Sequence, residues 1–326
     1  MKINPIIIIA GEPYGVFLEL FFKIFRTKII QKNKRTILLV GSKILILHQM
    51  KKFKYNFKIN LINEKFINDE ILDKSKINLI NVDLNNIKND NNTKNYIKEC
   101  FNIGLSLMKK KYGFALINGP ISKKKFLEKK FLGVTEYISH KTNSKKKEAM
   151  LIYGKKFSVS PITTHLPLKD VSKNINKNII IQKITTINNF YKTRLNKKVK
   201  FAVCGLNPHC ETIHKYSEEE KMIIPAIQIL NKKKIIVDGP FSADTLFMKK
   251  NLKKYDVFIG MYHDQVLTPI KAILGFEAIN VTLGIPFIRI SPDHGPNFLM
   301  FGKNKSDPKS LIQSLTFLNE INDIQS

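Results

Sequence analysis

Four of the seven histidines, His165, His209, His263 and His294, directly follow short apolar runs that are predicted to be strands. Imidazole suits divalent zinc, cobalt, nickel and iron, and three protein ligands with an open position is the usual catalytic arrangement. A single histidine after a strand is more often a structural hydrogen-bonding residue, but the repeated placement favours a metal. The long-range spacing matches no compact motif such as HExxH. We therefore predict a metal-dependent enzyme.

A second polar set, Lys271, Asn280 and Arg289, indicates an anionic ligand. Arg289 interrupts the apolar run Pro286–Ile290, and the chain has only four arginines. A buried guanidinium needs an anionic partner, which is either a ligand phosphate or carboxylate, or a structural Asp or Glu. Lys271 alone carries little weight in a lysine-rich chain, and Asn280 alone could be a structural amide.

Two further segments have both a structural and a functional interpretation. Asp244 precedes an apolar run, which is typical of a helix N-cap, but it could also orient a histidine or contact the ligand through a metal. The segment Asn118–Lys123 resembles a turn that enters a helix, and amides at such a helix start can receive an anion. An ordinary strand-to-helix turn is the stronger interpretation of that segment.

Strands that alternate with helices must position these residues, and this order favours an α/β fold with a largely parallel sheet. Ligands in such sheets bind beyond the carboxyl ends of the strands, where the histidines lie. The predicted strands are Pro5–Ala10, Thr36–Val40, Asn78–Val82, Phe114–Asn118, Ala149–Tyr153, Ser158–Thr163, Lys200–Cys204, Ile235–Asp238, Val257–Gly260, Ala278–Val281 and Phe287–Ile290. The predicted helices include Val16–Phe25, Asn92–Lys111, Ile179–Phe190, Glu218–Leu230 and Lys309–Asn322.

The net charge of +29 invites a nucleic-acid interpretation, which the composition argues against. Nearly all the positive charge is lysine, whereas proteins that read nucleic acid favour the planar fork of arginine. A solvated, lysine-rich surface that could attract phosphorylated substrates is the preferred interpretation. A basic nucleic-acid binder is the non-enzymatic alternative, and salt-dependent DNA binding without a bound metal would support it.

Length and composition bound the class of protein. The 326 residues allow a large core, as one large domain or as two lobes. No apolar stretch approaches the roughly 20 residues of a membrane-spanning helix, so we expect no membrane contact. Cys100, Cys204 and Cys210 show no disulfide or zinc-ribbon spacing, which indicates a cytoplasmic protein.

The ordered motifs resemble those of one family, 4-hydroxythreonine-4-phosphate dehydrogenase of pyridoxal phosphate biosynthesis. They cover nearly the whole chain in the family's order, and together they are specific although no single one is. No G-x-G-x-x-G follows a predicted strand, and no Walker A or G-x-S-x-G motif is present. The matching segments are Gly11–Pro13, Gly119–Lys123, Thr135–Glu136, Thr163–Leu168, Cys204–His209, Ala243–Phe247, Met261–Gln265, Asn280–Gly284 and Asp293–Gly295.

The resemblance implies a fold like the isocitrate and isopropylmalate dehydrogenases, with two α/β lobes, a cleft between them, and residues 1–326 as a single catalytic unit of two interleaved lobes. That fold binds its nicotinamide cofactor, NAD or NADP, without a Rossmann fingerprint. It also implies a homodimer with the site at the subunit interface. A divalent metal (Zn, Mg or Co) would be bound by His165, His209 and His263, with one histidine contributed by the partner subunit.

The implied reaction is oxidation of 4-phosphooxy-L-threonine to 2-amino-3-oxo-4-phosphooxybutanoate, which decarboxylates to 3-amino-2-oxopropyl phosphate on the route to pyridoxine 5'-phosphate. The metal would favour the substrate alkoxide, and hydride would leave for the cofactor. The substrate contacts carried over are Thr135, Lys271, Asn280 and Arg289, with Lys271 also counted as catalytic.

The chain departs from the family's pattern in loops near the expected site. Val134 stands where the family usually has a histidine, Tyr14 replaces a small residue, and the loop after His209 is shortened to Cys210–His214. A related dehydrogenase of 4-phosphorylated threonate or erythronate is therefore one alternative. A phosphate acyltransferase of similar fold is another, although acyl transfer to phosphate needs no set of three histidines.

Overall fold

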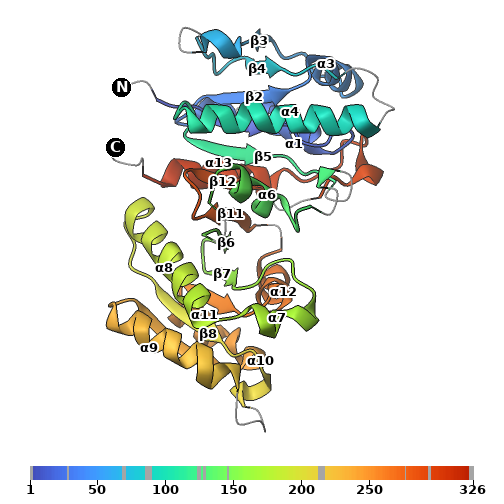
Figure 1. The fold of residues 1–326 in the computed structure, drawn as a ribbon. Helices are drawn as coiled ribbons and strands as arrows, with labels where there is room; N and C mark the ends of the chain where they lie inside the picture. The colour runs from blue at the N-terminus through green and yellow to red at the C-terminus, as the bar shows by residue number, and fades with distance from the viewer. Residues whose placement is uncertain are drawn as a thin grey trace. The chain divides into compact units, whose positions relative to one another are not determined.

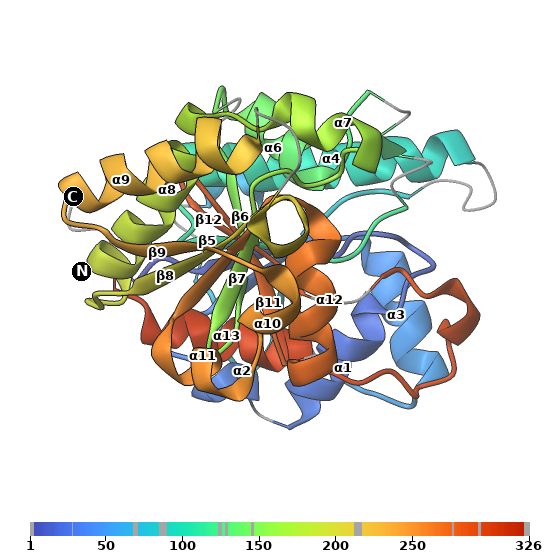
Figure 2. The same cartoon turned by 90° about the horizontal axis from the view of Figure 1, so that it is seen from below.

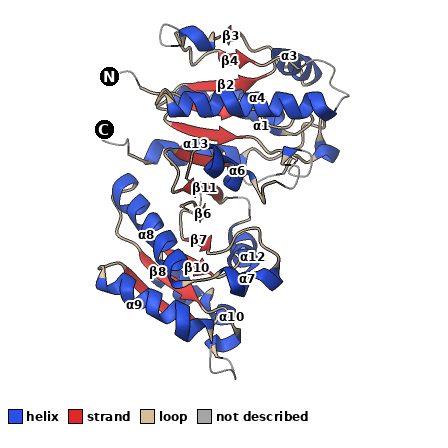
Figure 3. Cartoon of the chain, in the orientation of Figure 1, coloured by secondary structure: helices blue, strands red, loops and turns tan. Residues whose placement is uncertain are grey.

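The computed structural model describes residues 3–27, 29–67, 71–84, 90–122, 126–127, 130–144, 147–211, 217–275, 277–292 and 295–322. The chain divides into two compact units, residues 1–130 with 286–320 and residues 131–285 with 321–326. Each unit contains strands of a β-sheet, and helices pack on them (Figure 1 and Figure 3).

The strands of the first unit run in the order β3-β4-β2-β1-β5-β12, and neighbouring strands are parallel. Strand β1 consists of four isoleucines that are all fully buried, as expected for a parallel strand covered on both faces. These strands are β1 (Ile6–Ile9), β2 (Ile37–Gly41), β3 (Ile59–Leu61), β4 (Ile77–Asn81), β5 (Ala115–Asn118) and β12 (Ile288–Ser291).

Helix α4 covers one face of these strands, and α1 and α13 lie on the other face (Figure 2). The apolar spacing of α1 buries Phe17, Phe21 and Phe22, which explains its packing on the sheet. The helices are α1 (Phe17–Arg26), α2 (Ile29–Lys32), α3 (Lys43–Lys52), α4 (Asp90–Lys109) and α13 (Lys309–Glu320), with the 3₁₀ turns η1 (Glu64–Phe66) and η4 (Phe298–Met300).

The strands of the second unit run in the order β11-β6-β7-β10-β8-β9. Strand β6 is antiparallel to both of its neighbours, and β7, β10, β8 and β9 pair in parallel. The carboxyl ends of β7, β10 and β8 therefore meet at one edge. The strands are β6 (Ala149–Tyr153), β7 (Ser158–Pro161), β8 (Lys200–Cys204), β9 (Ile236–Phe241), β10 (Val257–Gly260) and β11 (Ile279–Leu283).

Helices α8 and α9 lie on one face of this unit, and α11 and α12 on the other (Figure 2). Phe258 of β10 anchors the core, with its ring centroid 5.5 Å from that of Phe157 and 5.2 Å from that of Phe247. The helices are α6 (Val134–Lys141), α7 (Leu168–Asn174), α8 (Lys177–Arg194), α9 (Ile224–Lys232), α10 (Ala243–Leu246), α11 (Lys249–Lys254) and α12 (His263–Leu274), with the 3₁₀ turn η2 (Pro208–Cys210) and the π-helical turn η3 (Glu219–Ile223).

The predicted α/β class is confirmed, and every predicted strand is present with its ends shifted by no more than three residues. The short strand β3 was not predicted. The helices given from the sequence as examples do not include α2, α3, α6, α7, α10, α11 and α12. The three cysteines are free thiols. Within the described residues, no helix combines the length and apolarity needed to cross a bilayer.

Candidate functional site

The segments that follow β7, β8 and β10 are joined by hydrogen bonds at their carboxyl ends. The backbone N–H and the hydroxyl of Thr163 both donate to the Met261 carbonyl, at 3.1 and 2.7 Å. Gln265 accepts from the Met261 N–H and donates to the Gly205 carbonyl, each at 2.7 Å. The three segments that carry His165, His209 and His263 are therefore anchored to one another.

His165 and His263 lie side by side, with their ring centroids 5.8 Å apart. Each ring places Nδ1 against a carboxylate oxygen: His165 against Glu136 Oε1 at 3.3 Å, and His263 against Asp264 Oδ1 at 2.6 Å. Proteins commonly orient metal-binding histidines in this way, because a carboxylate on one ring nitrogen fixes the tautomer and leaves the other nitrogen to ligate. This donor set fits a divalent metal.

Glu136, on the first turn of α6, is held as a carboxylate. Burial acts to raise the pKa of this carboxyl, but the hydrogen bond and charge of His165, together with the Thr164 hydroxyl at 2.9 Å, hold the pKa at about 2. Its second oxygen, Oε2, is buried without a hydrogen-bond partner. Gly133 permits this packing, since a Cβ there would lie 2.8 Å from the His165 ring and 2.7 Å from Glu136 Oε2.

The surroundings of His209 differ from those of His165 and His263. It is exposed in the turn η2, with a left-handed backbone at φ 56°. Among the described residues, no group of three or more His, Cys, Asp or Glu side chains is arranged to hold a metal. The structure thus brings His165 and His263 together, and does not bring His209 to them within one chain. His294 lies outside the described residues.

Asp244 is exposed in the first turn of α10, and it is not the N-cap, because Ser242 holds that position. The N-cap interpretation is therefore wrong. The hydrogen bond from the Ser242 hydroxyl at 2.6 Å and the nearby His209 lower the pKa of Asp244. Asp244 is accordingly close enough to interact electrostatically with His209.

Three of the predicted substrate-binding residues lie in the second unit. Thr135 is buried on α6, directly after the buried Val134. Lys271 is half-buried on α12, and this burial lowers the pKa of its ammonium group. Asn280, on β11, has a side-chain oxygen that is buried without a hydrogen-bond partner. An unsatisfied buried oxygen is costly, and a donor on a ligand would satisfy it.

Arg289 lies in the first unit, in the middle of β12, and is only 2% exposed. Its Nε donates to Asn118 Oδ1 at 2.7 Å, at the carboxyl end of β5. Glu12 is also buried here, and its Oε2 accepts from the Ser122 N–H at 2.9 Å. This carboxylate therefore occupies one of the amides that could have received an anion, while Lys123 lies outside the described residues.

Several residues that shape this region were given no role from the sequence. Thr163 and Gln265 lie inside motif segments, but nothing in their type indicated that they join strand ends. Glu218 and Glu219 belong to a run of three acids, residues 218–220, in a strongly basic chain. Glu219 is almost fully buried beneath the segment before His209. Consecutive acids before an apolar run, in a chain with few acids, were the available signal.

Comparison with known proteins identifies relatives along the whole chain. The family model "Pyridoxal phosphate biosynthetic protein PdxA" matches residues 33–318. A 4-hydroxythreonine-4-phosphate dehydrogenase of Sulfurihydrogenibium sp. is 36% identical over 316 residues, which is 94% of this chain and 95% of the relative. Another, from Wigglesworthia glossinidia brevipalpis, is 33% identical and spans 98% of this chain and 97% of the relative.

Solved structures show the same fold. A structure described as a putative 4-hydroxythreonine-4-phosphate dehydrogenase from Salmonella typhimurium superposes with a TM-score of 0.83 at 25% identity, covering 98% of this chain and 99% of that one. An isocitrate dehydrogenase from Methylococcus capsulatus, at 10% identity, has a TM-score of 0.51 and covers 97% of this chain and 85% of that one. The predicted likeness to the isocitrate dehydrogenase fold is confirmed.

Proposed function

The chain belongs to the 4-hydroxythreonine-4-phosphate dehydrogenase family of pyridoxal phosphate biosynthesis, and from this premise we propose that its activity requires a divalent metal and NAD or NADP. The reaction is oxidation of 4-phosphooxy-L-threonine to a β-keto acid, which decarboxylates to 3-amino-2-oxopropyl phosphate. The observation that carries the proposal is the pair His165 and His263, each with Nδ1 against a carboxylate.

The metal, Zn, Mg or Co, would be held by His165 and His263 of one subunit and His209 of the partner subunit, in a cytoplasmic homodimer with residues 1–326 as one catalytic unit. Two observations support a ligand from the partner. His209 is exposed, and no group of three ligating side chains forms within the described part of one chain. Asp244, which interacts electrostatically with His209, would help to orient that histidine as a ligand.

The bound groups would supply Lewis acidity at the substrate hydroxyl and a hydride acceptor. Lys271 would take the hydroxyl proton, since partial burial lowers the pKa of its ammonium group. The buried oxygen of Asn280 would accept from the substrate ammonium group. Thr135 and Arg289 would bind the phosphate and carboxylate, Arg289 through its planar fork.

The direct test is the activity of protein stripped of metal with a chelator and then reloaded with Zn, Mg or Co. We expect NADH or NADPH to form from 4-phosphohydroxythreonine only when metal is present. Reduced cofactor appearing at full rate without metal would refute the metal requirement. No reduced cofactor under any combination of metal and cofactor would refute the reaction.

A second substrate class is favoured by one observation. Val134, beside Thr135 on α6, is apolar and buried. The resemblance to the family implies a histidine at this position. A lost hydrogen bond would weaken discrimination among phosphorylated hydroxy acids. The same assay with 4-phosphorylated threonate and erythronate decides between the substrates by their kcat/KM values.

A further inference from the structure

A buried carboxylate lies directly beneath the turn that carries His209. Glu219 is 1% exposed. Its Oε1 accepts from the backbone N–H groups of Leu206 and Asn207, at 2.7 and 2.8 Å, and its Oε2 accepts from the Asn207 side-chain amide at 2.9 Å. Three donors from two consecutive residues thus converge on one charged group.

The local helix geometry explains how this carboxylate reaches the turn. Glu219 opens the π-helical turn η3, and Glu218 immediately precedes it. Glu218 Oε2 also accepts from the Asn207 amide, at 3.0 Å, while its other oxygen accepts from the Ser172 hydroxyl. Single π turns inside helices are frequent at functional sites.

The turn itself needs such support. His209 has a backbone φ of 56° and Cys210 a φ of 61°, a left-handed conformation that is unfavourable for residues with a Cβ. Strained conformations of this kind persist only where surrounding contacts over-determine them. Glu219 holds the preceding residues Leu206 and Asn207. The Asn207 carbonyl in turn accepts from the Cys210 N–H at 3.1 Å, and the hydrogen bond from Gln265 to the Gly205 carbonyl fixes the start of the same turn.

We propose that Glu219 is a positioning residue that holds the segment 205–209 in the conformation that presents His209 to the metal. This inference rests on the proposed metal site, because its effect acts through His209. Glu219 is almost fully buried and binds Leu206 and Asn207, so it is proposed as a support and not as a ligand. Removing such a support lowers metal affinity by roughly 10- to 100-fold.

The decisive variant is Glu219→Gln, which keeps the size of the side chain but replaces one accepting oxygen with a donor amide. Glu220→Gln is the matched control, since Glu220 is the exposed neighbour. Zinc is titrated into chelator-stripped protein at a temperature where circular dichroism shows every variant folded. We expect Glu219→Gln to bind zinc about 10- to 100-fold more weakly than wild type, and Glu220→Gln to bind like wild type.

A positioning role also predicts rescue. Saturating zinc should restore most of the kcat of Glu219→Gln, which loss of folded protein would not allow. If Glu219→Gln does not fold, Glu219→Asp carries the test, because it keeps the charge and withdraws the oxygens from the amides. Wild-type zinc affinity in a folded Glu219 variant overturns the proposal.

His209→Ala, measured in parallel, separates this inference from the proposed function. Full zinc affinity in His209→Ala means that His209 is not a ligand, and the proposed metal set fails. Weak binding in His209→Ala with wild-type binding in Glu219→Gln means that the metal set stands and the positioning role fails. Weak zinc binding in both variants supports both the proposed metal ligands and the positioning role of Glu219.

Discussion

The imidazole rings of His165 and His263 lie with their centroids 5.8 Å apart and their planes inclined by 37°. The two residues are about a hundred positions apart in sequence and come from different strand ends, which Thr163 joins by donating to the Met261 carbonyl. Two histidines that are brought together in this way, each with a carboxylate at Nδ1, form the best-defined part of the proposed metal site.

The first prediction concerns this pair. His263→Ala should abolish stoichiometric metal binding and lower kcat by at least about 100-fold, because one of the three proposed ligands is removed. Metal content by mass spectrometry and formation of NADH are the measurements. His48→Ala, at an exposed position on α3, is the control and should keep both. Retention of metal by His263→Ala would exclude this histidine as a ligand.

The second prediction is a pH dependence of the stability of the metal-free protein. The pKa of Glu136 is about 2 in the folded chain against an ordinary 4.5. As the pH falls, Glu136 therefore takes up a proton in the unfolded chain before it does so in the folded chain. The contribution of Glu136 to the free energy of unfolding is fully present above about pH 4.5 and is lost between there and about pH 2. The contribution is at most about 3 kcal/mol.

Urea unfolding of wild type and Glu136→Gln at a series of pH values tests this. The difference in free energy of unfolding should shrink as the pH falls through the window between the two pKa values. A difference that stays constant across that window would show that the carboxylate of Glu136 is not what stabilises the folded chain.

The sequence predicted the strands well because they are continuous apolar runs, such as the four isoleucines of β1. Such runs are typical of parallel strands that are buried on both faces of a sheet. It did not predict β3, because three residues are too few to show a pattern and none of them is fully buried, with Leu61 48% exposed. Helix α12 was not among the helices given from the sequence. It begins with polar residues and contains Pro269, which is unfavourable inside a helix.

The candidate site was predictable in residue type rather than in geometry. Histidines at strand ends indicated ligands, but the adjacency of His165 and His263 follows from strand order, which spacing alone does not fix. The π turn at Glu219 is a single turn, which is too short to produce a recognisable periodic pattern in the sequence. The exposure of His209 likewise depends on the left-handed backbone of His209 and Cys210, which residue type alone does not predict.

The third prediction concerns the buried arginine of β12. Arg289→Lys keeps the charge but loses the planar fork, so kcat/KM for the phosphorylated substrate should fall by about 10- to 100-fold. Steady-state kinetics measure this effect, which we expect mainly in KM. Arg194→Lys is the control, because Arg194 is also buried and donates to the Asn322 carbonyl at 2.8 Å. Equal losses in both variants would indicate general destabilisation.

The fourth prediction separates proton transfer from binding. Lys271→Arg keeps a cation that does not release its proton, so kcat should fall by roughly 10²- to 10⁴-fold while metal content stays unchanged. Because burial lowers the pKa of Lys271, the wild-type kcat should rise with pH to a plateau reached below the ordinary lysine value of 10.5. A Lys271→Arg variant with near-normal kcat would assign this residue to binding alone.

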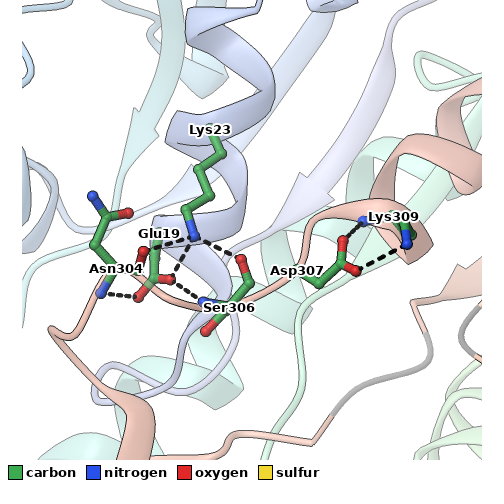
Figure 4. Close-up of polar contacts among 6 residues, drawn as sticks. All are labelled: Glu19, Lys23, Asn304, Ser306, Asp307 and Lys309. Carbon is green, nitrogen blue, oxygen red and sulfur yellow. Dashed lines mark hydrogen bonds and ion pairs between the residues drawn. The ribbon is translucent and has the colours of Figure 1, made fainter.

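A buried carboxylate in the first unit joins helix α1 to the chain before α13 (Figure 4). Glu19 is 1% exposed and contacts the Lys23 ammonium at 3.1 Å. It also accepts from the backbone N–H groups of Ser306 and Asn304, at 2.7 and 3.2 Å. The Lys23 ammonium donates in turn to the carbonyls of the same two residues. The pair therefore fixes a segment that lies nearly 300 positions away in sequence.

The fifth prediction is that Glu19→Ala lowers the free energy of unfolding by about 3 kcal/mol, because it leaves Lys23 without its carboxylate and two N–H groups without an acceptor. Asp307→Asn is the control from the same region. Its ion pair with Lys309 is exposed and should contribute less than about 1 kcal/mol. Urea unfolding of both variants measures the contrast. If Glu19→Ala is no more destabilised than Asp307→Asn, the segment 304–306 is held by its other packing and not by this carboxylate.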